Sequence, residues 1–256
     1  MHHVLLVAHG SRSSAANDQA RALCGAVRAI VPGGERVHLG FIELATPTMQ
    51  DALSQVLSVC RSHELDRVTI LPVLLTAAAH VKRDIAELAE RSRAERADIP
   101  IHVAPHIGAA PAIQRLFVDH VRHAATRARR GSPAAVIVSR GSGDPAAHDE
   151  TLAFVRVVAR DCPIDRVSVA YLAVREPTPI AAIEAAVQAG ADAVTVVPHL
   201  IFAGRLLLEI DSTVLPGART RMPSVSFDRT PILADDPAFP GVLASIVRNI
   251  SGPAVP

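Results

Sequence analysis

LLVAHGS, residues 5–11, is an apolar run that ends in a glycine turn, and a similar stretch, AVIVSRGS, occupies residues 135–142. Gly141 thus follows Gly10 by 131 residues. Short apolar runs bounded by turn signals are typical of strands that are buried on both faces of a parallel sheet. The two stretches therefore predict the same unit twice, a buried strand followed by a tight turn.

Two further pairs of segments repeat at nearly the same offset. GFIELATPTM at 40–49 matches AYLAVREPTP at 170–179, and VTILPVLL at 68–75 matches VTVVPHLI at 194–201. Their offsets are 130 and 126 residues. Self-similarity at a near-constant offset indicates an internal duplication. We expect two domains, residues 1–130 and 131–256, joined by the basic stretch 127–133, which contains Gly and Pro as linkers do.

Strand and helix patterns alternate through the first half. Strands are expected at Val4–Ala8, Val37–Ile42, Val68–Leu75 and Ile101–Ala104. Between and after them, apolar residues recur three or four apart, as on one face of a helix, within 16–30, 49–60, 81–89 and 113–125. Such alternation predicts a parallel sheet covered by helices on both faces. We therefore expect two similar, doubly wound α/β domains, each with a four-stranded parallel sheet, facing each other across a cleft.

The composition excludes some classes of function. The 256 residues carry 26 basic and 25 acidic side chains, a net charge of +1, with one Tyr, six Phe and no Trp. Nucleic-acid binders that act through bulk charge need a larger excess of basic residues, and those that act through base stacking need more aromatic residues. No nucleic-acid partner is therefore expected. No apolar run is long enough to cross a membrane, and the N-terminal run is too short for a signal peptide. Three cysteines without a CxxC pair favour buried thiols in a cytoplasmic protein.

Three candidate ligands follow three successive strands. His9 closes the first expected strand, Glu43 closes the second, and His80 follows the third. In open parallel sheets, ligands bind beyond the carboxyl ends of the strands, so the three side chains can converge there. Two imidazoles and a carboxylate suit a divalent first-row metal, and an imidazole without metal can take a proton near neutral pH. The first half also holds ten of the twelve histidines.

The duplication shows which of these residues the second half has lost. His9 matches Arg140, Glu43 matches Ala173, and, after a one-residue gap, His80 matches Arg205. Equivalent positions in the two halves should be equivalent in space. One copy is therefore predicted to be equipped for chemistry, and the other is a degenerate duplicate.

These residues resemble a known family. VAHGSR at 7–12, FIE at 41–43 and HVKRDI at 80–85 are similar to the sirohydrochlorin chelatases, the class II chelatases of siroheme and cobalamin synthesis. Long members of that family are tandem duplications. The resemblance implies a lyase that inserts Fe²⁺ or Co²⁺ into a tetrapyrrole without ATP or an organic cofactor. It implies that His9 and His80 bind the metal and that Glu43 is the carboxylate. Many members have glycine where this chain has Ala78 and Ala79.

Sirohydrochlorin is a polycarboxylate, so the site should present donors to it. The backbone N–H groups of residues 10–13, including Gly10 and Ser11, lie at an expected helix start and form a candidate anion site. We expect further donors near the histidines and in the second half, because arginine matches carboxylate geometry. These residues are Arg12, Lys82, Arg83, Arg140 and Arg205. The second half would then act as a lid and a carboxylate clamp.

Several questions stay open at this point. Iron, cobalt and nickel all accept imidazole, and either Glu43 or a second imidazole can accept the pyrrole protons. A non-catalytic metal or tetrapyrrole carrier, or a paralogue that uses the same metal site for different chemistry, fits the same residues. We expect a monomer, because the duplication can replace a dimer.

His120 and His123, in an Arg-rich helix, are expected to be solvated, and His106 to line the rim of the site.

Overall fold

The computed structural model describes residues 1–61, 66–127 and 131–251. The expected linker 127–133 and domain boundary fall partly outside these residues. In chain order the elements of the first repeat are β1 (His2–Ala8), α1 (Ser14–Ile30), β2 (Val37–Phe41), α2 (Met49–Val59), β3 (Arg67–Pro72), α3 (Ala79–Glu95), β4 (Ile101–Val103) and α4 (Pro111–Arg127). Those of the second are β5 (Pro133–Ser139), α5 (Pro145–Asp161), β6 (Arg166–Tyr171), α6 (Pro179–Gln188), β7 (Ala193–Pro198), α7 (Arg205–Glu209), α8 (Leu215–Arg221), β8 (Ser226–Arg229) and α9 (Phe239–Ser251).

Each repeat forms its own parallel sheet. The strand orders are β2-β1-β3-β4 and β6-β5-β7-β8, and every strand pair in both is parallel. The predicted fold class and duplication are confirmed. β3 ends at Pro72, earlier than expected, because the apolar residues that follow it, Val73–Leu75, are buried in the connection rather than in the strand.

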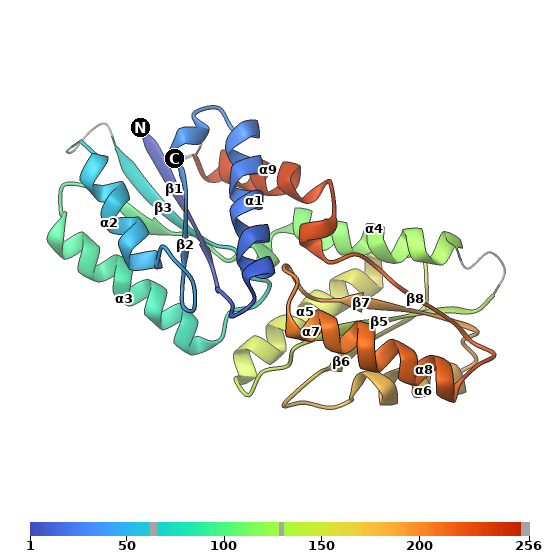
Figure 1. Cartoon of the computed structure of the whole chain (residues 1–256). Coiled ribbons are helices and arrows are strands. Elements are labelled where there is room, and N and C mark those ends of the chain that lie inside the picture. The colour runs from blue at the N-terminus through green and yellow to red at the C-terminus, as the bar shows by residue number, and fades with distance from the viewer. Residues whose placement is uncertain (62–65, 128–130, 252–256) are drawn as a thin grey trace. The chain divides into compact units, whose positions relative to one another are not determined.

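Alternate residues of β1 face two different helical layers. Leu5 and Val7 pack in one core with residues of α2 and α3. The opposite face, which includes the buried Leu6, is covered by α1 and α9, which contact each other as well as the sheet (Figure 1). In the second sheet, α6 and α8 cover the face of β5 that carries Val136, and α4 and α5 cover the other. A sheet buried on both faces explains why its strands are apolar without alternation.

The compact units differ from the expected division after residue 130. One unit comprises Met1–Ala110 and Pro237–Pro256, and the other comprises Pro111–Asp236. α4, the last helix of the first repeat, packs on α5 and β7, while α9, the last helix of the second, packs on α1 and β1. The repeats have therefore exchanged their final helices. An amphipathic helix shows that it must be buried, but its pattern does not specify against which sheet.

In the described part of the chain, no helix combines the length and the apolar character needed to cross a membrane.

Candidate functional site

His9 and Glu43 are in contact at the carboxyl edge of the first sheet. The Nδ1 atom of His9 lies 3.5 Å from the Oε1 atom of Glu43, and the two side chains are 41% and 54% exposed. His9 directly follows β1 and Glu43 comes two residues after β2, and the backbone N–H of Glu43 donates to the carbonyl oxygen of His9 (3.0 Å). The prediction that these strand ends bring an imidazole and a carboxylate together is confirmed for this pair.

Gly10 makes the close approach of the two loops possible. Its φ angle is +87°, in the left-handed region, and a Cβ atom at this position would lie only 1.8 Å from the carbonyl oxygen of Glu43. Only glycine combines this backbone conformation with this spacing at little cost. Gly10 thus allows His9 to lie beside Glu43, and its expected role in substrate binding through its N–H stays a prediction.

Asn17 braces the loop that follows His9, a role that the sequence did not reveal. This asparagine is 8% exposed, in the first turn of α1. Its Oδ1 atom accepts from the N–H of Ser11 (3.0 Å), and its Nδ2 atom donates to the carbonyl oxygen of Ser11 (2.8 Å). The N–H of Ser13 donates to the Ser11 hydroxyl oxygen (3.0 Å). Two N–H groups that we expected to bind an anion are therefore used within the loop. A polar residue on the buried face of an amphipathic helix was the available signal.

His80 reaches the same edge of the sheet from the third strand. β3 ends at Pro72, which pairs in register with Val7 near the end of β1. The connection then leads to the first turn of α3, where His80 is exposed. His80 is not part of the His9–Glu43 contact, so the structure brings two of the three predicted ligands together and places the third on a neighbouring segment.

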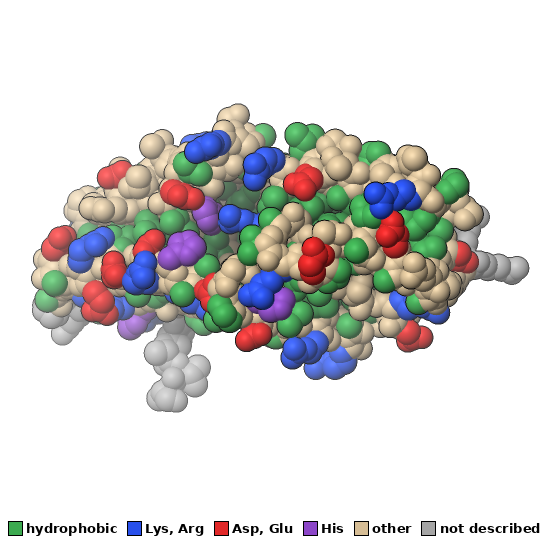
Figure 2. Space-filling view, turned by 90° about the horizontal axis from the view of Figure 1, so that it is seen from below, with side chains coloured by type: hydrophobic (Ala, Val, Ile, Leu, Met, Phe, Trp, Pro, Cys, Tyr) green, Lys and Arg blue, Asp and Glu red, His purple; other side chains and the backbone are tan. Residues whose placement is uncertain are grey.

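The three expected cations of the first repeat are all on the surface. Arg12 is exposed in the loop before α1, and Lys82 and Arg83 are exposed in the first turns of α3. The Nε atom of Arg83 lies 3.8 Å from a carboxylate oxygen of Glu87, one turn further along the helix. On the face shown in Figure 2, histidine side chains lie at the surface beside basic and acidic ones. The roles of Arg12, Lys82 and Arg83 in substrate binding stay predictions.

The second repeat reproduces the backbone of the His9 loop without its ligands. Gly141 has a φ angle of +86°, its Cβ would lie 2.0 Å from the carbonyl oxygen of Ala173, and the N–H of Ala173 donates to Arg140 O (3.0 Å). These features match those around Gly10 one by one. They confirm the pairing of His9 with Arg140, an exposed residue, and of Glu43 with Ala173.

The expected pairing of His80 with Arg205 was wrong by one position. α3 begins at Ala79 and α7 begins at Arg205. Most buried positions of the two helical segments keep the same offset of 126 residues, as in Val81 with Leu207, Leu88 with Val214 and Ala89 with Leu215, whereas Ile85 and Ile210 are 125 residues apart. The matching residue of His80 is therefore Leu206. The loss of the ligand still holds, because leucine cannot bind a metal.

His120 is not solvated, contrary to expectation. It is 7% exposed, its Nε2 atom lies 2.7 Å from the Oδ2 atom of Asp236, and its ring lies beside that of Phe117. The reason is its position on the inner face of α4, one turn after Phe117. His123 is exposed, as expected, and His106 is half-buried in the loop after β4.

A different set of metal-binding groups does converge in the described structure. One ligand atom from each of His3, Cys60 and Asp66 lies within 4.8 Å of the other two, at the opposite end of β1 from His9. Cys60 is buried, as expected of the three thiols. No spacing in the sequence connects these three positions.

The CbiX family model matches residues 3–124 and 134–250, which together span almost the whole chain. The chain belongs to the CbiX family. The two matched segments agree with the duplication that the sequence and the two sheets show.

Individual proteins and a solved structure are similar to the chain along most of its length. A sirohydrochlorin ferrochelatase from Priestia megaterium is 29% identical over 209 residues, which are 81% of this chain and 76% of the relative. A sirohydrochlorin cobaltochelatase from the same organism is 21% identical over 216 residues, 84% of this chain and 69% of the relative. SirB from Bacillus subtilis, in a structure with Fe³⁺, shares the fold with a TM-score of 0.79 at 22% identity, over 97% of this chain and 94% of SirB.

Proposed function

We propose that this protein is a sirohydrochlorin chelatase, a lyase that inserts Fe²⁺ or Co²⁺ into sirohydrochlorin without ATP. The observation that carries the proposal is the contact of His9 with Glu43 at the carboxyl edge of a CbiX-type sheet. The relatives named ferrochelatase and cobaltochelatase support the reaction and both metals. Siroheme or cobalamin biosynthesis is then the pathway.

His9 is suited to hold the incoming metal. Its Nδ1 atom faces Glu43 at 3.5 Å. A carboxylate beside Nδ1 favours the tautomer that carries the hydrogen on Nδ1. This tautomer leaves a lone pair on Nε2 for the metal. The side chains are both about half exposed, so a metal ion can enter and leave. Imidazole binds these ions, yet four ring nitrogens of a tetrapyrrole bind them more tightly. We propose His80 as the second ligand.

The reaction also needs acceptors for protons. Insertion of a divalent ion replaces two pyrrole N–H protons, so each turnover releases two protons from the macrocycle. Glu43 is exposed and adjacent to the proposed metal ligand, and a carboxylate or an imidazole in hydrogen-bond reach can take a proton from the ring and pass it to water. We propose Glu43 for this step as well as for orienting His9.

The substrate carboxylates need positive partners. Arg12, Lys82 and Arg83 are exposed on the segments that carry the histidines, and Arg140 and Arg205 follow the corresponding strands of the second repeat. We propose that these side chains bind the carboxylate rim of the tetrapyrrole. Cationic side chains form charge-assisted hydrogen bonds with carboxylates in other proteins. We further propose a monomeric, cytoplasmic enzyme, in keeping with the duplication and with Cys24, Cys60 and Cys162 as free thiols.

An anaerobic absorbance assay with sirohydrochlorin tests the proposal. Fe²⁺, Co²⁺ and Ni²⁺ are added in turn, with enzyme at a small fraction of the substrate concentration. Many metallated products per chain are expected with iron or cobalt. A burst that stops at one equivalent would instead indicate a carrier. Metal binding without any change in the tetrapyrrole spectrum would indicate a paralogue with different chemistry.

A further inference from the structure

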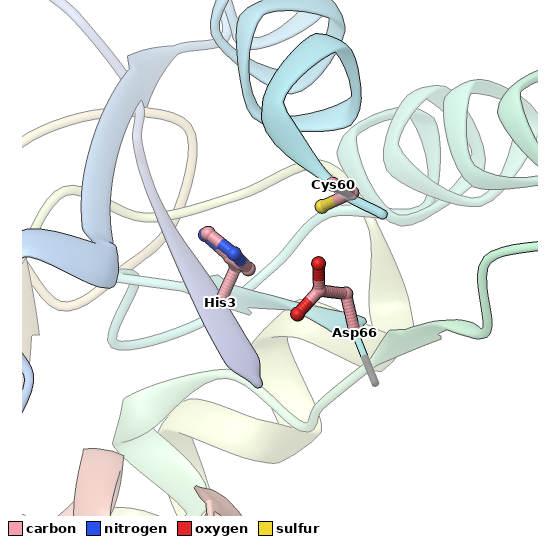
Figure 3. A group of neighbouring side chains, drawn as sticks. All are labelled: His3, Cys60 and Asp66. Atoms are coloured by element: carbon pink, nitrogen blue, oxygen red, sulfur yellow. The ribbon is translucent and has the colours of Figure 1, made fainter. Parts of the chain in front are cut away.

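Three buried side chains with different donor atoms meet near the amino end of the first sheet. His3 is the second residue of β1, Cys60 follows the last residue of α2, and Asp66 directly precedes β3. They are 7%, 8% and 4% exposed. One ligand atom of each lies within 4.8 Å of the other two, and Figure 3 shows the thiol, carboxylate and imidazole gathered around one space. Burial of such groups together is costly unless they are paired or bind a metal.

This cluster is separate from the proposed insertion site. His3 and His9 lie at opposite ends of β1, and six residues of a strand span about 20 Å. The two groups of ligands therefore lie at opposite edges of the same sheet. A metal at the cluster cannot reach a tetrapyrrole bound at His9 without leaving its ligands.

The imidazole of His3 is held as a metal ligand usually is. Its Nδ1 atom lies 3.2 Å from the Nε2 atom of His38, and the two rings are stacked. One of these nitrogens must carry the hydrogen of that bond. When His3 donates it, the Nε2 lone pair of His3 is free for a metal, and His38 acts as the outer partner that fixes the tautomer. Burial lowers the pKa of both imidazoles, that of His38 to about 4, so both are neutral near pH 7.

The charges of the cluster fit a divalent ion. Burial raises the pKa of the Cys60 thiol, so the thiol holds its proton when no metal is present. A metal ion replaces that proton: the S–H bond breaks, a sulfur–metal bond forms, and the proton goes to water. The Asp66 carboxylate is ionised, with its pKa lowered by the Met1 ammonium group at 2.8 Å and by the Arg61 N–H, which donates to it at 2.7 Å. The thiolate and the carboxylate then bring two negative charges to the ion, and the Met1 ammonium group stays beside the carboxylate.

We propose that His3, Cys60 and Asp66 form a binding site for a resident zinc-class ion, distinct from the metal that the enzyme inserts. Sulfur, nitrogen and oxygen donors together select borderline ions such as Zn²⁺, and three protein ligands leave a fourth position for water. The ion would join β1 to the end of α2 and the start of β3. Its role is then to stabilise the first unit.

Cobalt spectroscopy tests the site without relying on chelatase activity. The protein is the full, untagged chain carrying His9→Ala and His80→Ala, which removes the proposed insertion site. On addition of Co²⁺ we expect a near-ultraviolet thiolate-to-cobalt absorption that saturates at one equivalent. Cys60→Ser in this background should abolish it, and Asp66→Asn should weaken binding at least tenfold. Cys24→Ser, the matched control at another buried free thiol of the same unit, should leave it unchanged.

Zinc gives a second measurement on the same variants. Zn²⁺ should displace the cobalt band and raise the midpoint of thermal unfolding by several degrees, as any ligand that binds only the folded state does. That shift should disappear in Cys60→Ser, with circular dichroism showing that the variant is folded. The proposal is overturned if saturating Co²⁺ produces no thiolate band, or if the band survives in Cys60→Ser. Either result leaves the proposed chelatase function untouched, because that function is tested by sirohydrochlorin turnover.

Discussion

Gly10→Ala should damage both the stability of the first unit and metal insertion. An L-residue at φ +87° costs about 1–2 kcal/mol. The new Cβ would lie 1.8 Å from the carbonyl oxygen of Glu43, whereas real Cβ contacts are longer than 3.0 Å. The loop after β2 must therefore move by about 1.2 Å, and crowding of this kind costs about 1–3 kcal/mol. The sum is about 2–5 kcal/mol.

That displacement moves the carboxylate that faces His9. We expect the midpoint of thermal unfolding to fall by about 5–15 °C. We also expect the rate of cobalt insertion, measured by sirohydrochlorin absorbance well below the new midpoint, to fall at least tenfold, since misplaced catalytic groups are costly.

The chain supplies two matched controls. Gly141→Ala creates the same strain in the second repeat, with φ +86° and a Cβ 2.0 Å from Ala173 O. It should lower stability similarly and leave metal binding by His9 intact. Gly25→Ala, in α1 with open space around the new methyl group, should stabilise the protein by about 0.5–1 kcal/mol. Parental stability of Gly10→Ala would contradict this role of the glycine, and so would a destabilised variant that inserts metal at the parental rate.

Three further predictions concern other residues. Asn17→Ala removes both hydrogen bonds to the Ser11 backbone and should cost about 1–3 kcal/mol in urea unfolding, with a slower insertion rate; parental values for both would refute the bracing role. Tyr171, the single tyrosine, is 2% exposed, and burial raises its pKa above 10. Its absorbance titration should have a midpoint above pH 10. The stability from the neutral phenol is complete below pH 10 and should be lost as pH rises through the folded pKa, and this contribution should be absent in Tyr171→Phe. Arg140→Gln and Arg205→Gln should each raise the Michaelis constant for sirohydrochlorin about ten- to a hundredfold, at about 1.4 kcal/mol per decade, with Co²⁺ affinity unchanged; an unchanged constant in both would remove the second repeat from substrate binding.

The sheets could be predicted well because the pattern that identifies each strand lies within a short stretch of the sequence. Each buried strand is an apolar run that ends at a turn, and the offset between LLVAHGS and AVIVSRGS revealed the duplication directly. His9 and Glu43 could be paired in advance because parallel strands place their carboxyl ends at one edge. These inferences need only the periodicity of strands and the order of the elements.

The features that were missed depend on tertiary packing. The buried faces of α4 and α9 indicate burial but not the sheet against which each helix packs, so the exchange of helices was not predictable. Arg205 matches Ala79 of the first repeat rather than His80. This match can be seen only from the buried positions of α3 and of α7 with its continuation. The cluster joins His3 to Cys60 and Asp66, which lie 57 and 63 residues later in the chain, and the three match no motif spacing.

The loss of metal insertion in His9→Ala tests the central claim most directly. The measurement is the anaerobic rate of cobalt insertion at limiting Co²⁺, beside His80→Ala and the control His123→Ala, whose imidazole is exposed on α4. All three variants should show parental circular dichroism. We predict that insertion falls at least a hundredfold in His9→Ala and His80→Ala, and that it is unchanged in His123→Ala. Near-parental rates in both His9→Ala and His80→Ala would contradict the account, because the metal would then be delivered by other residues.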